Sequence, residues 1–199
     1  AKDIARELKV FGKNAFTPHE PRFEFMRRFE VLQSSEIPKN SSSANGFDLK
    51  IAFPYFSDFG DPLLDKKMGS YPEEMFRRLA EVGVNGIWLH TVLRTLVTPD
   101  EKGFPGDAKA AERIKGLQNL VNRAAKYGIR IFLYMNEPRS MEPEWFAASP
   151  ERAAYAGVEV RGKVGFCSSN PEVLAWLTRS LNSVFTQVKG LGGIFTISA

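Results

Sequence analysis

The stretch Val84-Asn85-Gly86-Ile87-Trp88-Leu89-His90-Thr91-Val92 (VNGIWLHTV) is a nearly continuous apolar run that begins directly after Gly83. Runs of this kind, bounded by turn residues, are typical of strands buried on both faces of a parallel sheet. The same pattern returns at 129–135 (IRIFLYM), again after a glycine, Gly128. Helical periodicity fills the sequence between the two runs. We therefore predict parallel strands that are joined by helices.

Two further strands and two further helices extend this alternation. Ser70 and Glu73 have the spacing of a capping box, which predicts a helix start at Ser70. Asn170 followed by Pro171 predicts an N-cap and a first helical residue. The expected strands are 49–56, 84–92, 129–135 and 192–197, and the expected helices open at Ser70, Ala108 and Asn170 and extend through 82, 127 and 188.

Two α/β folds fit this alternation, an open doubly wound sheet and a (β/α)8 TIM barrel. The loop 57–62 (SDFGDP) after the first strand lacks the glycine pattern of a dinucleotide-binding sheet. Long polar and aromatic loops follow the strands, whereas the helix-to-strand turns are short, as in barrel enzymes. A complete barrel needs about 250 residues. We therefore predict the N-terminal half of a TIM barrel, with about four parallel strands and crossover helices.

The Ser-, Asn- and Pro-containing run 34–46 (SSEIPKNSSSANG) is the clearest linker in the chain. It divides a short N-terminal segment and linker, 1–46, from the partial barrel, 47–199. The third strand is followed by an insertion, 142–166. Within it, 158–166 predicts a small hairpin turning at Arg161-Gly162, which acts either as a lid or as packing under a long loop.

The composition excludes several classes of function. The chain has 199 residues and a net charge of only +4, and it contains no dense basic block, so we expect no nucleic-acid partner. No apolar run is long enough for a membrane span, so we expect no membrane partner. The single cysteine, Cys167, allows no internal disulfide. No residues have metal-ligand spacing, so we expect neither a metal nor another cofactor. The sequence does not indicate a compartment.

Polar residues gather where each predicted strand ends. In a barrel, the carboxyl ends of the strands face one mouth, so these groups are expected to converge on one ligand. Carboxylates, amides and guanidinium groups suit sugar hydroxyls, and aromatic faces suit sugar rings. The candidate catalytic residue is Glu137, and the candidate substrate-binding residues are Tyr55, Asp58, Asp61, His90, Arg94, Asn136 and Arg139.

Each candidate also has a structural alternative. Asp61 precedes a proline, and its alternative role is that of a turn residue without contact to a ligand. His90 can be a core histidine, and Arg94 can form a salt bridge with the acidic pair Asp100-Glu101. Glu137 can cap the backbone of the loop that follows it. These alternatives stay open on the sequence alone.

Several motifs resemble barrel glycoside hydrolases. Tyr71-Pro72 followed by 79–90 (LAEVGVNGIWLH) resembles their first helix and second strand, and 124–131 (AAKYGIRI) and 169–173 (SNPEV) add to the likeness. The nearest family is the family 20 type of glycoside hydrolase with its uncharacterised bacterial relatives, over roughly 47–199. This resemblance implies a carbohydrate ligand and hydrolysis of O-glycosidic bonds by paired carboxyl groups.

The resemblance assigns sugar binding to Asn136, Glu137 and Arg139. It places the catalytic acid in an Asp-Glu pair after the fourth strand, which the sequence does not contain before Ala199. We therefore expect an N-terminal fragment that is inactive alone and is completed by the rest of the barrel or self-associates through exposed edges. The tripeptide 136–138 (NEP) also matches the acid/base motif of a large retaining glycosidase clan, although that motif belongs on a fourth strand.

Two other functions remain open. One is a non-catalytic carbohydrate-binding or scaffold barrel domain, and the other is an open α/β domain that binds another small ligand.

Overall fold

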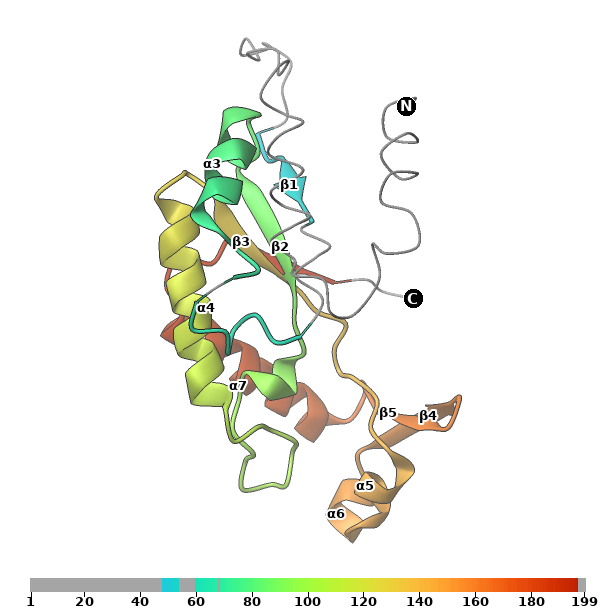
Figure 1. Ribbon diagram of the computed structural model, residues 1–199. Helices are drawn as coiled ribbons and strands as arrows, with labels where there is room; N and C mark the ends of the chain where they lie inside the picture. Colours follow the sequence, from blue (N-terminus) through green and yellow to red (C-terminus); the bar gives the residue numbers. More distant parts are fainter. Residues whose placement is uncertain (1–47, 54–59, 68, 197–199) are drawn as a thin grey trace, which may run out of the picture. The chain divides into compact units, whose positions relative to one another are not determined.

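The computed structural model describes residues 48–53, 60–67 and 69–196. These residues form a parallel four-stranded sheet with helices between its strands, and a separate two-stranded antiparallel sheet (Figure 1). The elements are β1 Ile51–Ala52, α3 Glu73–Glu81, β2 Gly86–His90, the 3-10 turn η2 Leu93–Thr95, α4 Ala110–Ala125, β3 Arg130–Tyr134, α5 Pro143–Ala147, α6 Pro150–Ala153, β4 Ala156–Val160, β5 Lys163–Phe166, α7 Pro171–Gln187 and β6 Gly193–Phe195.

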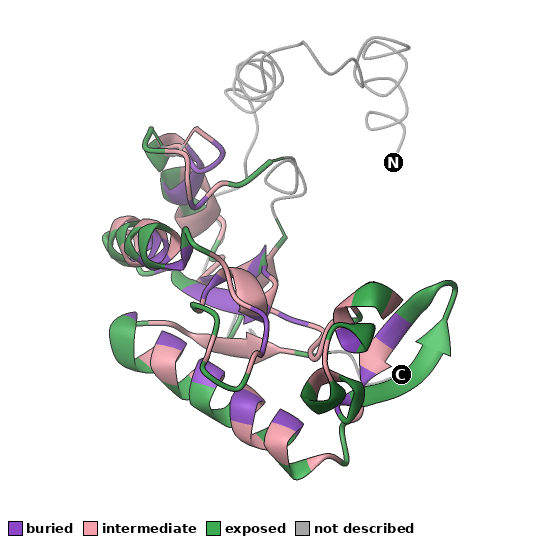
Figure 2. Ribbon diagram, turned by 90° about the horizontal axis from the view of Figure 1, so that it is seen from below, coloured by how far each residue is buried: buried purple, intermediate pink, exposed green. Residues whose placement is uncertain are grey.

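The order of the strands distinguishes between the two candidate folds. The parallel strands follow one another as β1-β2-β3-β6, so each new strand is added on the same side of the last. A doubly wound sheet instead starts in its middle and reverses direction at a switch point. Right-handed crossovers in a sequential sheet place all helices on one face, and Figure 2 shows α3, α4 and α7 along one side. The predicted half-barrel architecture is confirmed.

The two faces of the sheet differ in composition. The face toward the helices carries fully buried aliphatic side chains, including Ile87, Leu89 and Ile131. The opposite face carries aromatic side chains, of which Phe132 is buried and Trp88, Tyr134 and Phe195 are half-buried. On that face the Trp88 ring lies 4.5 Å from the Tyr134 ring and 6.3 Å from the Phe195 ring, measured between centroids. The helix-facing side therefore holds the main core.

The buried residues of the helices complete this core. They lie at helical spacing on one face of each helix, and Figure 2 shows the buried positions of α7 on the side that faces the sheet. The buried apolar residues are Met75 and Phe76 in α3, Ala110, Ile114, Leu117, Leu120, Val121 and Ala124 in α4, and Val173, Trp176 and Val184 in α7.

Of the two predicted helix caps, one is confirmed and one is wrong. The Asn170 side chain caps α7 by accepting hydrogen bonds from the backbone N–H groups of Glu172 and Val173. The capping box at Ser70 does not form, because Pro72 occupies the N-cap position and α3 begins at Glu73. Glu73 is thus the first helical residue rather than the third. The capping box needs a glutamate at the third helical position, from which its side chain can bond to the backbone N–H of the N-cap residue.

The insertion after β3 folds into two short helices and the predicted hairpin. Arg161 and Gly162 form its turn with φ values of 53° and 74°, the pair of positive values that a two-residue hairpin loop requires. The predicted turn is confirmed. Buried aromatic residues join this insertion to α7, with the Phe104 ring stacked between the rings of Tyr155 and Trp176 at 4.4 Å and 5.1 Å. The insertion therefore packs against the outer helices.

Parts of the sequence interpretation lie outside the described residues. The N-terminal segment and linker, 1–46, are among these, and so are Tyr55 and Asp58 after the first strand.

Close packing at Gly116 provides a test of the fold. A Cβ atom at this position in α4 would lie 2.0 Å from the backbone carbonyl oxygen of Leu63. Gly116→Ala should therefore destabilise the protein by about 1–3 kcal/mol through overpacking. Helix propensity alone predicts the opposite, a gain of about 1 kcal/mol. Urea unfolding measures the change, and a stabilised variant would contradict this contact.

Lys115→Ala is the matched control, because Lys115 is the exposed neighbour of Gly116 in the same helix. It should change the free energy of unfolding by less than about 0.5 kcal/mol.

Candidate functional site

The pairing of β2 with β3 brings two predicted site residues to one edge of the sheet. In the parallel register His90 lies opposite Tyr134, so both strands end at the same level. The His90 and Tyr134 rings have centroids 5.4 Å apart. The Asn136 amide Nδ2 donates to the Tyr134 hydroxyl at 3.1 Å. His90 and Asn136 therefore share one neighbourhood, with Tyr134 between them.

Glu137 joins the ends of the same two strands through its carboxylate. Its Oε1 accepts a hydrogen bond from the backbone N–H of Leu93 at 2.7 Å, and its Oε2 accepts from the backbone N–H of Arg139 at 3.0 Å. Leu93 begins η2 in the loop after β2, whereas Arg139 follows β3. The carboxylate thus holds the two loops together across the strand ends. The structural alternative for Glu137, a backbone-capping role, is what the geometry shows.

Burial also changes the acidity of Glu137. Desolvation raises the pKa of this carboxyl above its ordinary value. The two backbone hydrogen bonds and the charges of Arg139 and Arg94 favour the ionised form and oppose this rise. Burial has the larger effect, so the neutral acid is favoured relative to an exposed glutamate.

Arg139 extends the cluster to His90. Its Nη2 lies 2.7 Å from His90 Nε2. A guanidinium group can only donate, so Nε2 must accept and the ring proton must lie on Nδ1. His90 is exposed in the described structure, and the alternative of a core histidine is therefore wrong.

Arg94 has a different environment from the one its structural alternative predicts. Asp100 forms its ion pair with Arg179 at 3.0 Å and not with Arg94. Within the described ranges, no ion pair joins Arg94 to Glu101 or to another carboxylate. Four buried polar atoms lack a hydrogen-bond partner in the described part of the chain, namely Trp88 Nε1, Thr91 Oγ1, Arg94 Nη1 and Arg139 Nε. All four belong to strand β2, strand β3 or the residues directly after them.

Asp61 lies in a separate network. Its Oδ2 accepts from Arg113 Nε of α4 at 2.7 Å, and its Oδ1 accepts from the backbone N–H of Leu63 at 3.2 Å. Arg113 also pairs with Asp107. No contact between described residues joins Asp61 to the His90 cluster. The turn role that the sequence allowed for Asp61 is therefore seen.

The sequence interpretation missed two components of the site. Tyr134 was read only as part of a strand, although a tyrosine at a strand end needs a partner for its hydroxyl group. The backbone N–H of Leu93 carries no sequence signal, because any residue except proline offers the same donor. Trp145 lies in the insertion, with the Arg152 guanidinium 4.8 Å from its ring centroid.

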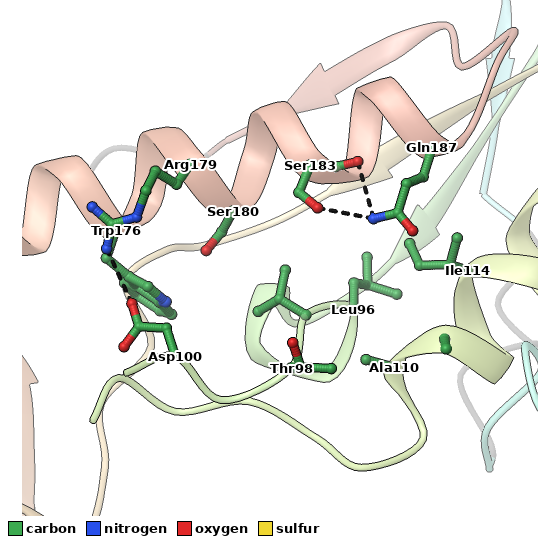
Figure 3. A pocket seen from close by; sticks show the side chains of 12 residues that line it. Leu96, Thr98, Asp100, Ala110, Ile114, Trp176, Arg179, Ser180, Ser183 and Gln187 are labelled. Carbon is green, nitrogen blue, oxygen red and sulfur yellow. Dashed lines mark hydrogen bonds and ion pairs between the residues drawn. The ribbon is translucent and has the colours of Figure 1, made fainter. Parts of the chain in front are cut away.

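Two hollows among the described residues lie away from these strand ends. One of about 270 Å³ lies between α4 and α7, where Asp100 and Arg179 pair and Gln187 bonds to Ser183 (Figure 3). A second, of about 260 Å³, lies between the 63–66 segment and α4. Both are on the helix side of the sheet, so neither belongs to the strand-end cluster.

Two searches of the described residues gave negative results. No group of three or more histidine, cysteine, aspartate or glutamate side chains among them is placed to hold a metal ion. No helix among them is long and apolar enough to cross a membrane.

Comparison with known proteins gives a likeness in structure only. No protein-family model matches the chain, and no curated protein matches it. An α-amylase from Geobacillus thermoleovorans, complexed with acarbose, superposes with a TM-score of 0.50 and 16% identity over 75% of this chain and 40% of its own. A maltogenic α-amylase, AmyB, from Thermotoga neapolitana gives a TM-score of 0.48 and 17% sequence identity. The match covers 76% of this chain and 39% of the amylase chain.

The galactosidase domain of the α-galactosidase-sucrose kinase AgaSK gives a TM-score of 0.40 at 13% identity, over 61% of this chain and 18% of its own. The chain thus spans about two fifths of the length of the two amylases. The likeness to the Geobacillus enzyme agrees with the barrel-type order of the strands.

The raised pKa of Glu137 gives a testable dependence of stability on pH. The folded state binds this proton more tightly than the unfolded chain does, so ionisation of Glu137 favours unfolding. As pH rises from below about 4.3, the ordinary value for glutamate, the wild type should lose stability relative to Glu137→Gln. Urea unfolding of both proteins at several pH values measures the difference in their free energies of unfolding. A wild type that becomes more stable relative to Glu137→Gln as pH rises would contradict the prediction.

Glu74→Gln is the matched control with the opposite sign. Hydrogen bonds from Arg77 and Arg78 lower the pKa of Glu74 to about 2. The wild type should therefore gain stability relative to Glu74→Gln as pH rises from about 2 through the ordinary value. The effect should shrink with added salt, because this group lies at the surface.

Proposed function

We propose that the chain is part of a carbohydrate-active barrel enzyme, whose complete form hydrolyses O-glycosidic bonds. The observation that carries this proposal is the strand-end cluster, the connected group formed by His90, Asn136, Glu137 and Arg139 at the carboxyl edge of a half-barrel. In TIM-barrel enzymes, the active site lies at this edge. Amide, imidazole and guanidinium groups of this kind suit a ligand rich in hydroxyl groups.

Glu137 is the proposed catalytic carboxyl group. Its burial favours the protonated form, and a protonated carboxyl group is what a glycosidase uses to protonate the departing oxygen. The mechanism needs a second carboxyl group, at about 5–5.5 Å for retention or about 6.5–9.5 Å for inversion. That second group is expected from protein outside the described residues. Asn136 and Arg139 are proposed to hold the sugar.

Two further considerations bear on this proposal. The α-amylase structure that superposes with a TM-score of 0.50 and 16% identity supports the barrel fold on which the proposal rests. The sequence motifs at 79–90, 124–131 and 169–173 resemble barrel glycoside hydrolases, and the family 20 relationship rests on these motifs alone.

One observation favours a second candidate function, a non-catalytic carbohydrate-binding domain. Both oxygens of the Glu137 carboxylate already accept backbone hydrogen bonds. A carboxylate used in this way stabilises loops and does not need to transfer a proton. In that case the cluster would bind a saccharide without cleaving it.

Sugar binding at the strand-end cluster can be measured directly. Saturation-transfer NMR with simple methyl glycosides should detect binding at about millimolar affinity, which is typical of few polar contacts. Asn136→Ala should weaken binding about tenfold, because the amide is lost at the edge of the site. Asn122→Ala, a matched change on the exposed side of α4, should leave binding unchanged. Absence of binding to every glycoside would refute the proposed function.

Catalysis is tested separately with chromogenic glycosides. We expect no measurable turnover from the 199-residue chain, because the described cluster supplies one carboxyl group of the required two. Turnover that Glu137→Gln abolishes would overturn this expectation and show that the chain holds a complete site.

A further inference from the structure

Among the described residues, the strand-end cluster and the neighbouring Arg94 of η2 together carry more positive than negative charge. Arg94 and Arg139 both lie near Glu137. Arg94 directly follows Leu93, whose backbone N–H donates to Glu137, and Arg139 donates to Glu137 through its own backbone N–H. Glu137 is the carboxylate that the contacts bring into this cluster, and Asp61 is held by Arg113 elsewhere. Two guanidinium groups therefore face one carboxylate.

That single carboxylate does not neutralise either arginine by direct contact. Both Glu137 oxygens accept from backbone N–H groups. Across the described residues, the ion pairs within 4.0 Å include neither Arg94 nor Arg139, whereas Arg113, Arg123 and Arg179 each pair with an acidic side chain. Among the described residues, neither arginine at the strand ends is therefore in contact with an anionic side chain.

Both guanidinium groups are also partly removed from water. Arg94 Nη1 and Arg139 Nε are buried and have no acceptor among the described residues. Buried polar groups in folded proteins are nearly always satisfied, so neighbouring exceptions of the same charge point to a missing acceptor. Arginine offers several donors in a planar fork, which suits the oxygens of a carboxylate or a sulfate.

The hydrogen bond that joins the Arg139 guanidinium to a described side chain is weaker than a bond to an anion. It donates to the Nε2 atom of His90, a neutral acceptor. Hydrogen bonds to ionised oxygen are roughly twice as strong as those between neutral groups, so an arriving anion would compete well for this donor. His90 is exposed, which leaves this side of the cluster open to a ligand.

We propose that the strand-end cluster recognises an anionic saccharide, one that carries a carboxylate or a sulfate, through Arg94 and Arg139. Asn136 and the Tyr134 hydroxyl then contact the neutral hydroxyl groups of the same sugar. This inference rests on the proposed carbohydrate function and narrows its substrate class. The absence of a glycine-rich phosphate loop after the first strand argues against a nucleotide as the anion.

Two matched pairs of ligands test the proposal on the full chain by titration calorimetry. The first pair is methyl β-glucuronide and methyl β-glucoside, of which only the glucuronide carries a carboxylate. The second pair is N-sulfoglucosamine and N-acetylglucosamine, of which only the first carries a sulfate group. We expect at least one acidic sugar to bind about tenfold more tightly than its neutral partner, a preference that weakens with added salt. The pair that shows the preference identifies the anion as a carboxylate or a sulfate.

Variants locate this preference. Arg94→Gln and Arg139→Gln should each reduce the acidic sugar's advantage to within about twofold while binding of the neutral sugar persists. Arg130→Gln is the control, since it removes the same charge at the opposite end of β3. Arg139→Lys keeps the charge but loses the planar fork, so it should retain only part of the preference. If a glutamine variant fails to fold, the ligand comparison on the wild type still decides the question.

The outcomes separate the two proposals. Equal binding of acidic and neutral sugars would overturn the anionic assignment and leave the carbohydrate function in place. Absence of binding to any sugar would overturn both. Inorganic sulfate binding as tightly as the acidic sugar would show an anion site without saccharide recognition, which also overturns the assignment. A preference that survives in both glutamine variants would contradict the role of the two arginines.

Discussion

The parallel register between β2 and β3 is the constraint on which the rest of the site depends. It places His90 opposite Tyr134, so that the residues after both strands emerge at one level. A shift of one residue would turn every side chain of a strand to the opposite face. Packing inside the sheet supports this register, because Gly86 has no side chain and leaves room for the Phe132 ring. A Cβ atom at Gly86 would lie 2.9 Å from that ring.

A buried carboxylate then converts this alignment of strands into a fixed arrangement of loops. Glu137 accepts from the backbone on both sides, which ties the start of η2 to the residues after β3. Charged hydrogen bonds of this type contribute about 1.5–3 kcal/mol each, enough to offset part of the cost of burying the group. Arg94 follows Leu93 directly and Arg139 donates its own backbone N–H, so both residues are held near Glu137. No ion pair among the described residues includes either of them.

Local patterns predicted the elements better than the contacts between them. The apolar runs around Ile87 and Ile131 identified the central strands, and Arg161-Gly162 identified the hairpin turn, because these signals depend on neighbours in the chain. The ion pair between Asp61 and Arg113 joins residues 52 positions apart, and no local spacing reveals it. Likewise, the sequence placed Glu137 at a strand end but contained no sign that a backbone N–H group 44 residues away would be its partner.

The insertion after β3 explains how the loops at this edge are supported from outside. Phe104 belongs to the segment between η2 and α4, Tyr155 to the insertion, and Trp176 to α7, and their rings form one stack. Aromatic stacking of this kind adds about 0.5–1.5 kcal/mol per pair to the burial of apolar area. The stack connects the loop after β2 with the insertion after β3, the same two connections that Glu137 joins at the strand ends. Two independent attachments, one polar and one aromatic, therefore restrain the loops that carry Arg94 and Arg139, and a site held at two points can keep the two guanidinium groups in place until a ligand arrives.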